Sequence, residues 1–289
     1  MGLKEKIEAG IFSVLAEMEP PKGVEVSALV SSARRVKDSV DAFVVPEMSN
    51  AVMRMSSLGG AMVLQNEGMP TIFQVCCRDR NRLAIQGDLL AAHALGITTV
   101  MAVGGEDPSF GDHHQARPVY DIDLPTLIGA VDRLNKGRDM AGIELNGSPD
   151  FLIGSTAEAG AKGKSTEMEV EEMMKKTAAG ARFFIASPIF DLSLLEPFQK
   201  RIDPRKMALI PTVMLLKSLG IARYIQRNLP HIHIPEAIID RIARAPDKVR
   251  ECLLIASDLV RDLKQRGFSG VYLSTLGWEN KLPEIIEGI

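Results

Sequence analysis

The sequence has few cysteines, no block of like charge and no long apolar run, and each absence excludes a class of protein. Its three cysteines, Cys76, Cys77 and Cys252, fit neither a disulfide framework nor a Cys-x-x-Cys metal site, so we expect a reducing cytoplasm. Lys and Arg number 34 against 37 Asp and Glu, a formal net charge of −3, which argues against a nucleic-acid partner. No window approaches the roughly 18 apolar residues of a membrane helix, and the amino terminus does not resemble a signal peptide.

Short β-rich runs alternate with longer helical patterns along the whole chain of 289 residues. Such alternation is typical of a parallel sheet with helical crossovers. The runs predict these eight strands: Phe12–Glu17, Ala42–Val45, Thr71–Cys76, Thr98–Val103, Phe151–Gly154, Arg182–Ser187, Met207–Thr212 and Gly270–Ser274.

The helical patterns between the strands predict amphipathic helices over Ser27–Val36, Asn81–Leu95, Leu124–Leu134, Thr166–Ala179, Leu216–Asn228 and Pro246–Arg266. An added helix is expected between Pro230 and Pro246. A closed eight-stranded barrel typically takes about 250 residues, and no linker divides the chain. We therefore predict a single α/β domain over residues 1–289, a (β/α)8 TIM barrel with extra helices near the C-terminus.

Polar and charged residues follow three of the predicted strands. The run Gln74–Arg82 covers the end of the third strand and the residues after it, Glu17 ends the first strand, and Glu106 comes just after the fourth. Barrel enzymes carry their chemistry on loops at the carboxyl ends of the strands. We therefore expect these groups to share one pocket.

Period-two alternation places Ser13, Leu15, Glu17 and Glu19 on one face of the first strand. A carboxylate on a barrel-facing side is costly unless it is paired or solvated in a cavity. An ion pair of Glu17 or Glu19 with Lys22, or with an arginine of the rim, explains the pattern as well as a catalytic role does.

Gly104 and Gly105 follow the fourth strand and leave room for a ligand to approach the backbone. No third glycine opens a helix, so a dinucleotide fingerprint is a weak interpretation. The adjacent His113 and His114 lack companion carboxylates at metal-ligand spacing, and we favour a surface loop over a metal site.

The predicted helix from Thr166 has acidic residues early and two lysines late, which suits the helix dipole. Glu171 with Lys175, and Glu172 with Lys176, have the four-residue spacing of ion pairs. This structural explanation of the lysines holds unless a phosphate is placed nearby.

Seven segments together resemble methylenetetrahydrofolate reductases in order and spacing, most closely the short bacterial form without a regulatory domain. They are Glu17–Lys22, Cys77–Arg82, Gly87–Leu90, Gly111–His113, Val119–Asp123, Gly180–Phe184 and Ile189–Asp191. The resemblance implies a flavin-bearing barrel that reduces 5,10-methylenetetrahydrofolate to 5-methyltetrahydrofolate.

The resemblance also implies catalytic roles for Glu17 and Glu106. Glu17 matches the family's general acid, which protonates N10 of the substrate so that the five-membered ring opens to an iminium cation. Such an acid needs a raised pKa, for which Leu15, Phe12 and the barrel lining are the expected apolar setting. Glu106 matches an aspartate that binds the pterin and places negative charge near the flavin.

The cofactor expected from the resemblance is FAD, with FMN as an alternative, and NADH is the expected electron donor. Tyr120 matches an aromatic residue that contacts the flavin, and Lys176 matches a cation on its phosphate side. Gln74 stands where many members have histidine beside the flavin. The complete set expected to bind cofactor is Gln74, Arg78, Gly104, Gly105, Tyr120 and Lys176, with no metal ligand.

Three positions depart from the family pattern. Ser187 stands where a glutamine usually contacts the folate, and Leu219 stands near the place of a stacking phenylalanine. Pro46 replaces part of a threonine-bearing turn and has no N–H to donate. We keep Ser187 and Leu219 as the expected substrate-binding residues.

Alternative functions stay open at this point. One is a folate- or flavin-binding subunit with weakened activity that acts with an electron-transfer partner, and another is a pterin-binding methyltransferase barrel that needs no flavin. NAD(P)H and methylenetetrahydrofolate are the expected small-molecule partners. We also expect self-association or a hetero-complex.

Overall fold

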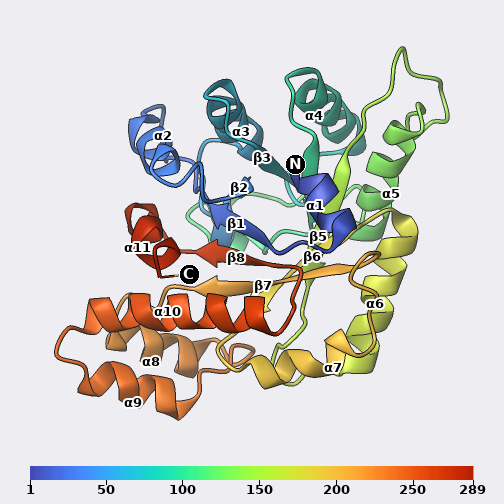
Figure 1. Ribbon diagram of the computed structural model, residues 1–289. Coiled ribbons are helices and arrows are strands. Elements are labelled where there is room, and N and C mark those ends of the chain that lie inside the picture. The colour runs from blue at the N-terminus through green and yellow to red at the C-terminus, as the bar shows by residue number, and fades with distance from the viewer. Residues whose placement is uncertain (289) are drawn as a thin grey trace.

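The computed structural model describes residues 1–288. Eight parallel strands form a closed barrel in the order β1 to β8, with β8 pairing back onto β1 (Figure 1). The predicted TIM barrel is confirmed. The strands are β1 (Ser13–Glu17), β2 (Ala42–Val45), β3 (Thr71–Cys76), β4 (Thr99–Val103), β5 (Leu152–Ala157), β6 (Phe183–Pro188), β7 (Ala208–Met214) and β8 (Gly270–Ser274).

Helices surround the strands in a ring (Figure 1). They are α1 (Leu3–Ala9), α2 (Ser27–Arg34), α3 (Ser57–Asn66), α4 (Arg82–Ala94), α5 (Leu124–Asn135), α6 (Thr166–Ala179), α7 (Glu196–Gln199), α8 (Leu219–Asn228), α9 (Glu236–Arg244), α10 (Lys248–Gln265) and α11 (Leu282–Ile286). Short 3-10 turns occur at η1 (Ser49–Ala51), η2 (Pro108–Phe110), η3 (Leu192–Leu195) and η4 (Glu279–Lys281).

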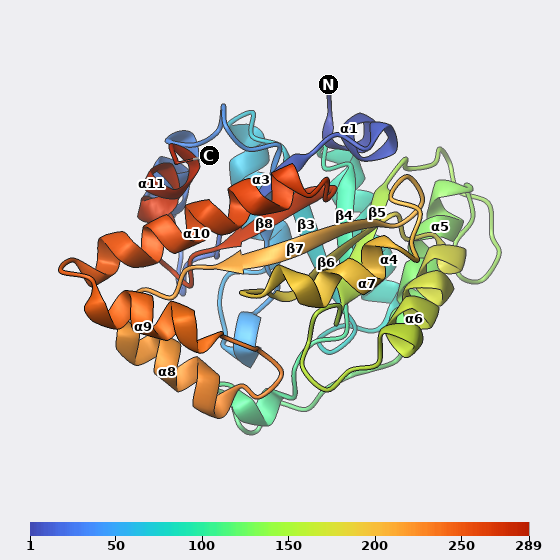
Figure 2. The ribbon, with the colours of Figure 1, turned by 60° about the horizontal axis from the view of Figure 1, so that its bottom comes forward.

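Side-chain caps define where several of these helices begin. Asn81 caps α4, Asp123 caps α5 and Ser165 caps α6, each accepting a backbone N–H of the first turn. Ser218 caps α8, so that helix begins at Leu219 rather than at Leu216 as predicted. The expected added helix is α9, which packs with α8 and α10 (Figure 2).

The barrel interior is a small apolar cluster that includes Leu15, Val44, Ile72 and Ile185. A larger cluster lies between the outer faces of the strands and the helices. The helix α1 adds Leu3 and Ile7 to the interior cluster, and Figure 1 shows it in front of the strands, within the ring of outer helices. This helix therefore covers the amino-terminal end of the barrel, which leaves the carboxyl ends of the strands for the site.

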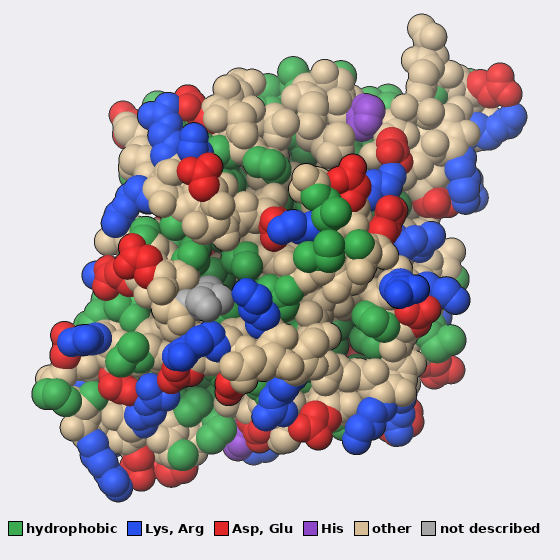
Figure 3. Space-filling view, viewed as in Figure 1, with side chains coloured by type: hydrophobic (Ala, Val, Ile, Leu, Met, Phe, Trp, Pro, Cys, Tyr) green, Lys and Arg blue, Asp and Glu red, His purple; other side chains and the backbone are tan. Residues whose placement is uncertain are grey.

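Acidic and basic side chains are interspersed over the face shown in Figure 3, without a block of one sign. This distribution agrees with the near balance of charge in the sequence. Within residues 1–288, no helix has the length and apolar character needed to cross a membrane.

Candidate active site

Glu17 ends β1 at the mouth of the barrel, on the barrel-facing side predicted from its alternation. Tyr272 Oη donates to Glu17 Oε2 at 2.6 Å, and Ser274 Oγ donates to Oε1 at 3.1 Å. Burial raises the pKa of Glu17 above its ordinary value, and the two hydrogen bonds oppose that rise only in part. The carboxyl is therefore partly accessible but strongly desolvated, which favours its protonated form.

The apolar surroundings of Glu17 differ in one respect from those expected. Leu15 lies in the interior cluster below it, whereas Phe12 packs against the outer cluster. The expectation for Phe12 was wrong because residues of opposite parity on a strand face opposite sides. Tyr272, which is 8% exposed, takes that place beside Glu17.

Glu19 forms the ion pair that was the alternative explanation for the acidic pattern. Arg54 Nε lies 3.0 Å from Glu19 Oε1, and the same guanidinium donates to the Pro20 carbonyl. Lys22 pairs instead with Asp112, in the loop after β4. Rim pairing thus explains Glu19, while Glu17 has hydroxyl partners and no ion pair among the described residues.

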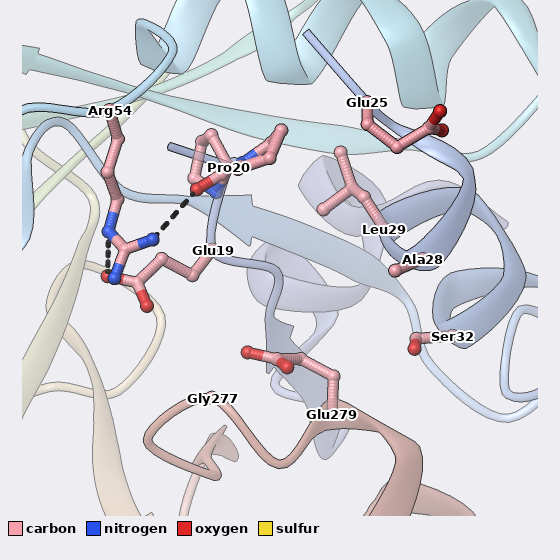
Figure 4. Close-up of a pocket in the computed structure, with 10 residues that line it drawn as sticks. Glu19, Pro20, Glu25, Ala28, Leu29, Ser32, Arg54, Gly277 and Glu279 are labelled. Carbon is pink, nitrogen blue, oxygen red and sulfur yellow. Dashed lines mark hydrogen bonds and ion pairs between the residues drawn. The ribbon is translucent and has the colours of Figure 1, made fainter. Parts of the chain in front are cut away.

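A cavity of about 320 Å³ opens beside this pair, lined by Glu19, Arg54 and Glu279 together with the start of α2. Figure 4 shows Glu19 and Glu279 on facing walls, with the Glu279 carboxylate directed toward Glu19. Burial also raises the pKa of Glu279, and Glu19 adds to the rise. The structure therefore gathers three carboxylates at the junction of β1 and β8.

Gln74 lies on the third strand with its side chain toward the barrel interior. Its Oε1 accepts the Glu47 N–H at 3.1 Å, and its Nε2 lies 3.7 Å from the sulfur of Met101. Glu47 is itself buried, with its carboxylate held by the Ser57 N–H and by Arg80. Its pKa is raised mainly by burial. Gln74 is thus fixed by backbone and core contacts at the mouth.

Arg78 is 2% exposed and its guanidinium is fully engaged with protein. Asp79 binds it at 2.7 and 2.8 Å, and the carbonyls of Met48 and Glu106 accept from it. The Glu106 carboxylate lies 3.5 Å from Arg78 and is itself exposed. Arg78 therefore joins the loops after β2, β3 and β4.

Glu17 ends β1 and Glu106 follows β4, so β2 and β3 lie between them in the barrel. The carboxylates that raise the pKa of Glu17 are those of Glu19 and Glu279. The structure thus gives Glu17 acidic neighbours different from the one expected. Pairing of Glu17 with Glu106 across one ligand stays a prediction.

The paired glycines leave the backbone open on one side of the loop after β4. A Cβ at Gly104 would meet no atom within 4 Å, whereas one at Gly105 would lie 2.4 Å from the Cys76 sulfur. Tyr120 Oη donates to the Gly105 carbonyl at 3.2 Å, and the ring is 48% exposed. An open backbone beside an exposed aromatic ring suits a planar ligand.

Lys176 differs from the ion pairing expected on its helix. Its Nζ donates to the Thr156 carbonyl of β5 at 2.8 Å, while Lys175 pairs with Glu172 at three-residue spacing. The predicted pairs Glu171 with Lys175 and Glu172 with Lys176 were therefore wrong. The Lys176 charge therefore lies at the backbone near the carboxyl end of β5.

Ser187 and Leu219 are both half-buried. Ser187 lies on β6 next to an irregularity in the β6–β7 pairing, between Ile185 and Pro188. Leu219 opens α8 and packs partly against the outer cluster. The two residues come from neighbouring barrel units, and their contact with substrate stays a prediction.

His113 and His114 lie on an exposed loop, as favoured from the sequence. Their Nδ1 atoms hydrogen-bond to Asp112 and to the Ser109 carbonyl. Residues 1–288 contain no group of three or more His, Cys, Asp or Glu residues arranged to hold a metal ion.

Comparison with known families identifies the relatives of this barrel. A family model described as methylenetetrahydrofolate reductase matches residues 2–289. The chain belongs to this family. Membership in the methylenetetrahydrofolate reductase family supports a folate-related reductase role. A search of curated proteins gives no match.

Several solved structures of similar shape are distant in sequence. One is 2,3-dimethylmalate lyase, with a TM-score of 0.57 and 10% identity over 99% of this chain and 81% of that one. Oxaloacetate acetylhydrolase with bound 3,3-difluorooxalacetate gives 0.54 and 12%, over 94% and 78%. EDTA monooxygenase from Chelativorans sp. BNC1 gives 0.54 and 10%, over 96% and 92%. At these identities the likeness shows the barrel fold alone.

Sequence reasoning missed the residues of β8 that hold Glu17. Tyr272 and Ser274 share one parity of β8, opposite to Val271 and Leu273, and this polar alternation was a usable signal. Because β8 closes the barrel against β1, both hydroxyls necessarily lie beside the first strand. Arg54 and Lys217 lie on loops and Glu279 opens η4, and none of the three gave a comparable signal.

Proposed function

We propose that this member of the methylenetetrahydrofolate reductase family is a flavin-dependent enzyme that reduces 5,10-methylenetetrahydrofolate to 5-methyltetrahydrofolate. Its electrons come from NAD(P)H or from a partner protein. The observation that carries the proposal is the desolvated Glu17 carboxyl at the barrel mouth, held by Tyr272 and Ser274.

Glu17 is the general acid in this proposal. Tyr272 donates to Oε2 and Ser274 donates to Oε1, so both oxygens of the carboxyl that carries the acidic proton are held in place by hydroxyl groups. Transfer of that proton to N10 of the folate breaks the bond between N10 and the bridging carbon, and the ring opens to an N5 iminium cation. The resulting carboxylate then lies close to the developing positive charge. A positioned acid of this kind contributes about 10²- to 10⁴-fold in rate.

The residues on the β3 to β5 side fit a flavin. Gly104 leaves space beside the backbone, the ring of Tyr120 is exposed, and Lys176 brings a positive charge to the end of β5. When bound, the flavin would supply the hydride that reduces the iminium carbon. Arg78 would act by holding the Glu106 loop in place, and Glu106 would set negative charge at the rim. We propose FAD, with FMN as the alternative.

Substrate would contact Ser187 and Leu219 on the neighbouring units. Serine reaches less far than glutamine and makes fewer hydrogen bonds, and leucine offers no aromatic face. These departures favour a second candidate, a flavin- or folate-binding subunit that is reduced only with a partner protein. We propose a cytoplasmic setting, in keeping with the buried free thiols of Cys76, Cys77 and Cys252.

The first test is the absorbance spectrum of the purified protein before and after NADH. A flavin spectrum bleached by NADH supports the reductase, and bleaching only with a partner protein supports the subunit. Protein that stays colourless after incubation with FAD and with FMN contradicts the reductase and favours the folate-binding subunit.

The second test separates the half-reactions with Glu17→Gln, which removes the acidic proton but keeps the shape. Reduction of the flavin should be retained, and reduction of the folate should fall by at least about 10²-fold. Glu171→Gln, on the exposed face of α6, is the matched control. Equal loss of both half-reactions in Glu17→Gln would contradict the acid role.

A further inference from the structure

Lys217 joins the loops that follow β7 and β8. Its Nζ donates to the Leu276 carbonyl, and the same ammonium lies 5.2 Å from the centre of the Trp278 ring. The loop that carries Leu276 and Trp278 leads directly to Glu279, which lines the cavity beside Glu19 and Arg54. One lysine therefore connects the start of the α8 unit to the wall of the acidic site.

Both ends of this connection have a left-handed backbone. Lys217 has a φ of +60° and Leu276 a φ of +53°, and neither is glycine. Such residues are strained and persist only where the surrounding contacts hold them. The side-chain bond from Lys217 to Leu276 is a contact that holds both at once.

Lys217 also brings positive charge to a site rich in carboxylates. The charged groups that face it are Glu279, Glu19 and Glu17. Burial lowers the pKa of Lys217, and the three carboxylates oppose that fall. Arg54 is occupied by Glu19, and Tyr272 is a neutral donor to Glu17. Lys217 and Arg54 both lower the pKa of Glu279, and Lys217 is the one of the two that is not paired with Glu19.

We propose that Lys217 is a positioning residue of the acid site, where it clasps the β7 loop to the β8 loop and balances the charge of Glu17 and Glu279. The effect of Lys217 on catalysis rests on the proposed function. The clasp, by which we mean the contacts of Lys217 with Leu276 and Trp278, does not. Lys217 lies two residues before Leu219, so the clasp also ties the expected substrate-binding end of α8 to this wall.

Trp278 gives a direct probe of the clasp, because it is the one tryptophan in the chain. Lys217→Met removes the charge and the donor, and we expect emission at longer wavelength with steeper quenching by acrylamide. Lys217→Arg keeps a cationic donor and should retain most of the wild-type behaviour. Lys175→Met makes the same charge change on α6, away from this wall, and should not differ from wild type. Should Lys217→Met fail to fold, Lys217→Gln replaces it.

Unchanged emission and quenching in a folded Lys217→Met or Lys217→Gln protein would overturn the clasp. These measurements need neither flavin nor folate. Their outcome is therefore independent of whether the protein reduces folate at all.

The catalytic consequence is tested by pH profiles of the two half-reactions. Removing a nearby positive charge disfavours the Glu17 carboxylate and raises the pKa of this group. The rate of folate reduction falls with pH as Glu17 loses its proton. In Lys217→Met this fall should therefore move to higher pH, by roughly half a pH unit or more, while flavin reduction keeps its rate. Lys217→Arg should restore the wild-type profile.

A fall at unchanged pH, with equal losses in both half-reactions, would overturn the positioning role and indicate a general structural defect. If the wild-type protein fails to reduce folate, the proposed function fails, and the tryptophan measurement still decides the clasp.

Discussion

Glu17 carries a stability cost that follows from its place in the barrel. Its pKa is raised from an ordinary value of 4.5 by burial, so the folded state binds the proton more tightly than the unfolded state does. The resulting stabilisation is fully present below the ordinary pKa and is lost as the pH rises through the raised pKa of the folded state. Above that range the folded protein must hold a desolvated negative charge.

We therefore predict that Glu17→Gln is more stable than wild type at neutral pH, by about 0.5–2 kcal/mol, and equal to it near pH 4. Glutamine has no charge to desolvate and can still accept from Tyr272. Thermal unfolding at a series of pH values measures the difference. A constant gap at every pH would show that packing, rather than ionisation, distinguishes the two proteins.

Tyr272→Phe tests the hydroxyl that holds the acid. The hydrogen bond from Tyr272 opposes the rise in the Glu17 pKa, so its loss should move the fall in the rate of folate reduction to higher pH. Loss of a bond to a charged acceptor is worth about 1.5–3 kcal/mol, and we expect folate reduction at neutral pH to slow by about ten-fold or more. Stopped-flow measurement of both half-reactions checks this. The control is Tyr224→Phe on α8, whose ring is 60% exposed, and a similar loss there would remove any special role for Tyr272.

At the scale of elements, the alternation of patterns predicted all eight strands to within a few residues, because buried parallel strands are apolar runs bounded by turns. The helix α3 was not predicted, since Gly59 and Gly60 weaken its pattern. The glycines in this helix are explained by tertiary packing. A Cβ at Gly60 would lie 3.0 Å from Val45 and 3.1 Å from Pro20, so glycine lets α3 pack closely on the ends of β1 and β2.

The candidate site was only partly predictable for a similar reason. Glu17 could be found from its own strand, because parity and position place it at the mouth. Its partner Tyr272 lies 255 residues away in sequence, and contact between them depends on closure of the barrel. Lys217 and Leu276 both have a left-handed backbone, and neither is a glycine, so the sequence gives no signal for these turns.

The loops after β2 and β4 pack backbone to backbone, and Gly111 makes this possible. A Cβ at Gly111 would lie 1.8 Å from the Ala51 carbonyl oxygen, so Gly111→Ala must push the loops apart. We predict a destabilisation of about 1–3 kcal/mol and faster hydrogen exchange near Met53, whose N–H is bound by Asp112.

Gly87→Ala is the matched control for that change. Gly87 lies in α4 with no atom within 4 Å of a built Cβ, so alanine should stabilise the helix by about 0.8–1 kcal/mol. Denaturant unfolding of both variants gives the comparison. Gly111→Ala that unfolds like wild type would show that the two loops do not meet as described.

At the scale of the whole molecule, α1 covers one end of the barrel, and Glu17 lies at the other. Ile7 is 1% exposed within the interior cluster, so Ile7→Ala should cost about 2–5 kcal/mol. Because α1 covers the end opposite Glu17, turnover per folded molecule should be unchanged.

Ile11→Ala, at a residue that is 41% exposed, is the control and should cost much less. Denaturant unfolding and activity corrected for the folded fraction test both points. Lowered turnover in fully folded Ile7→Ala would mean that the two ends of the barrel are coupled through the interior cluster that connects them.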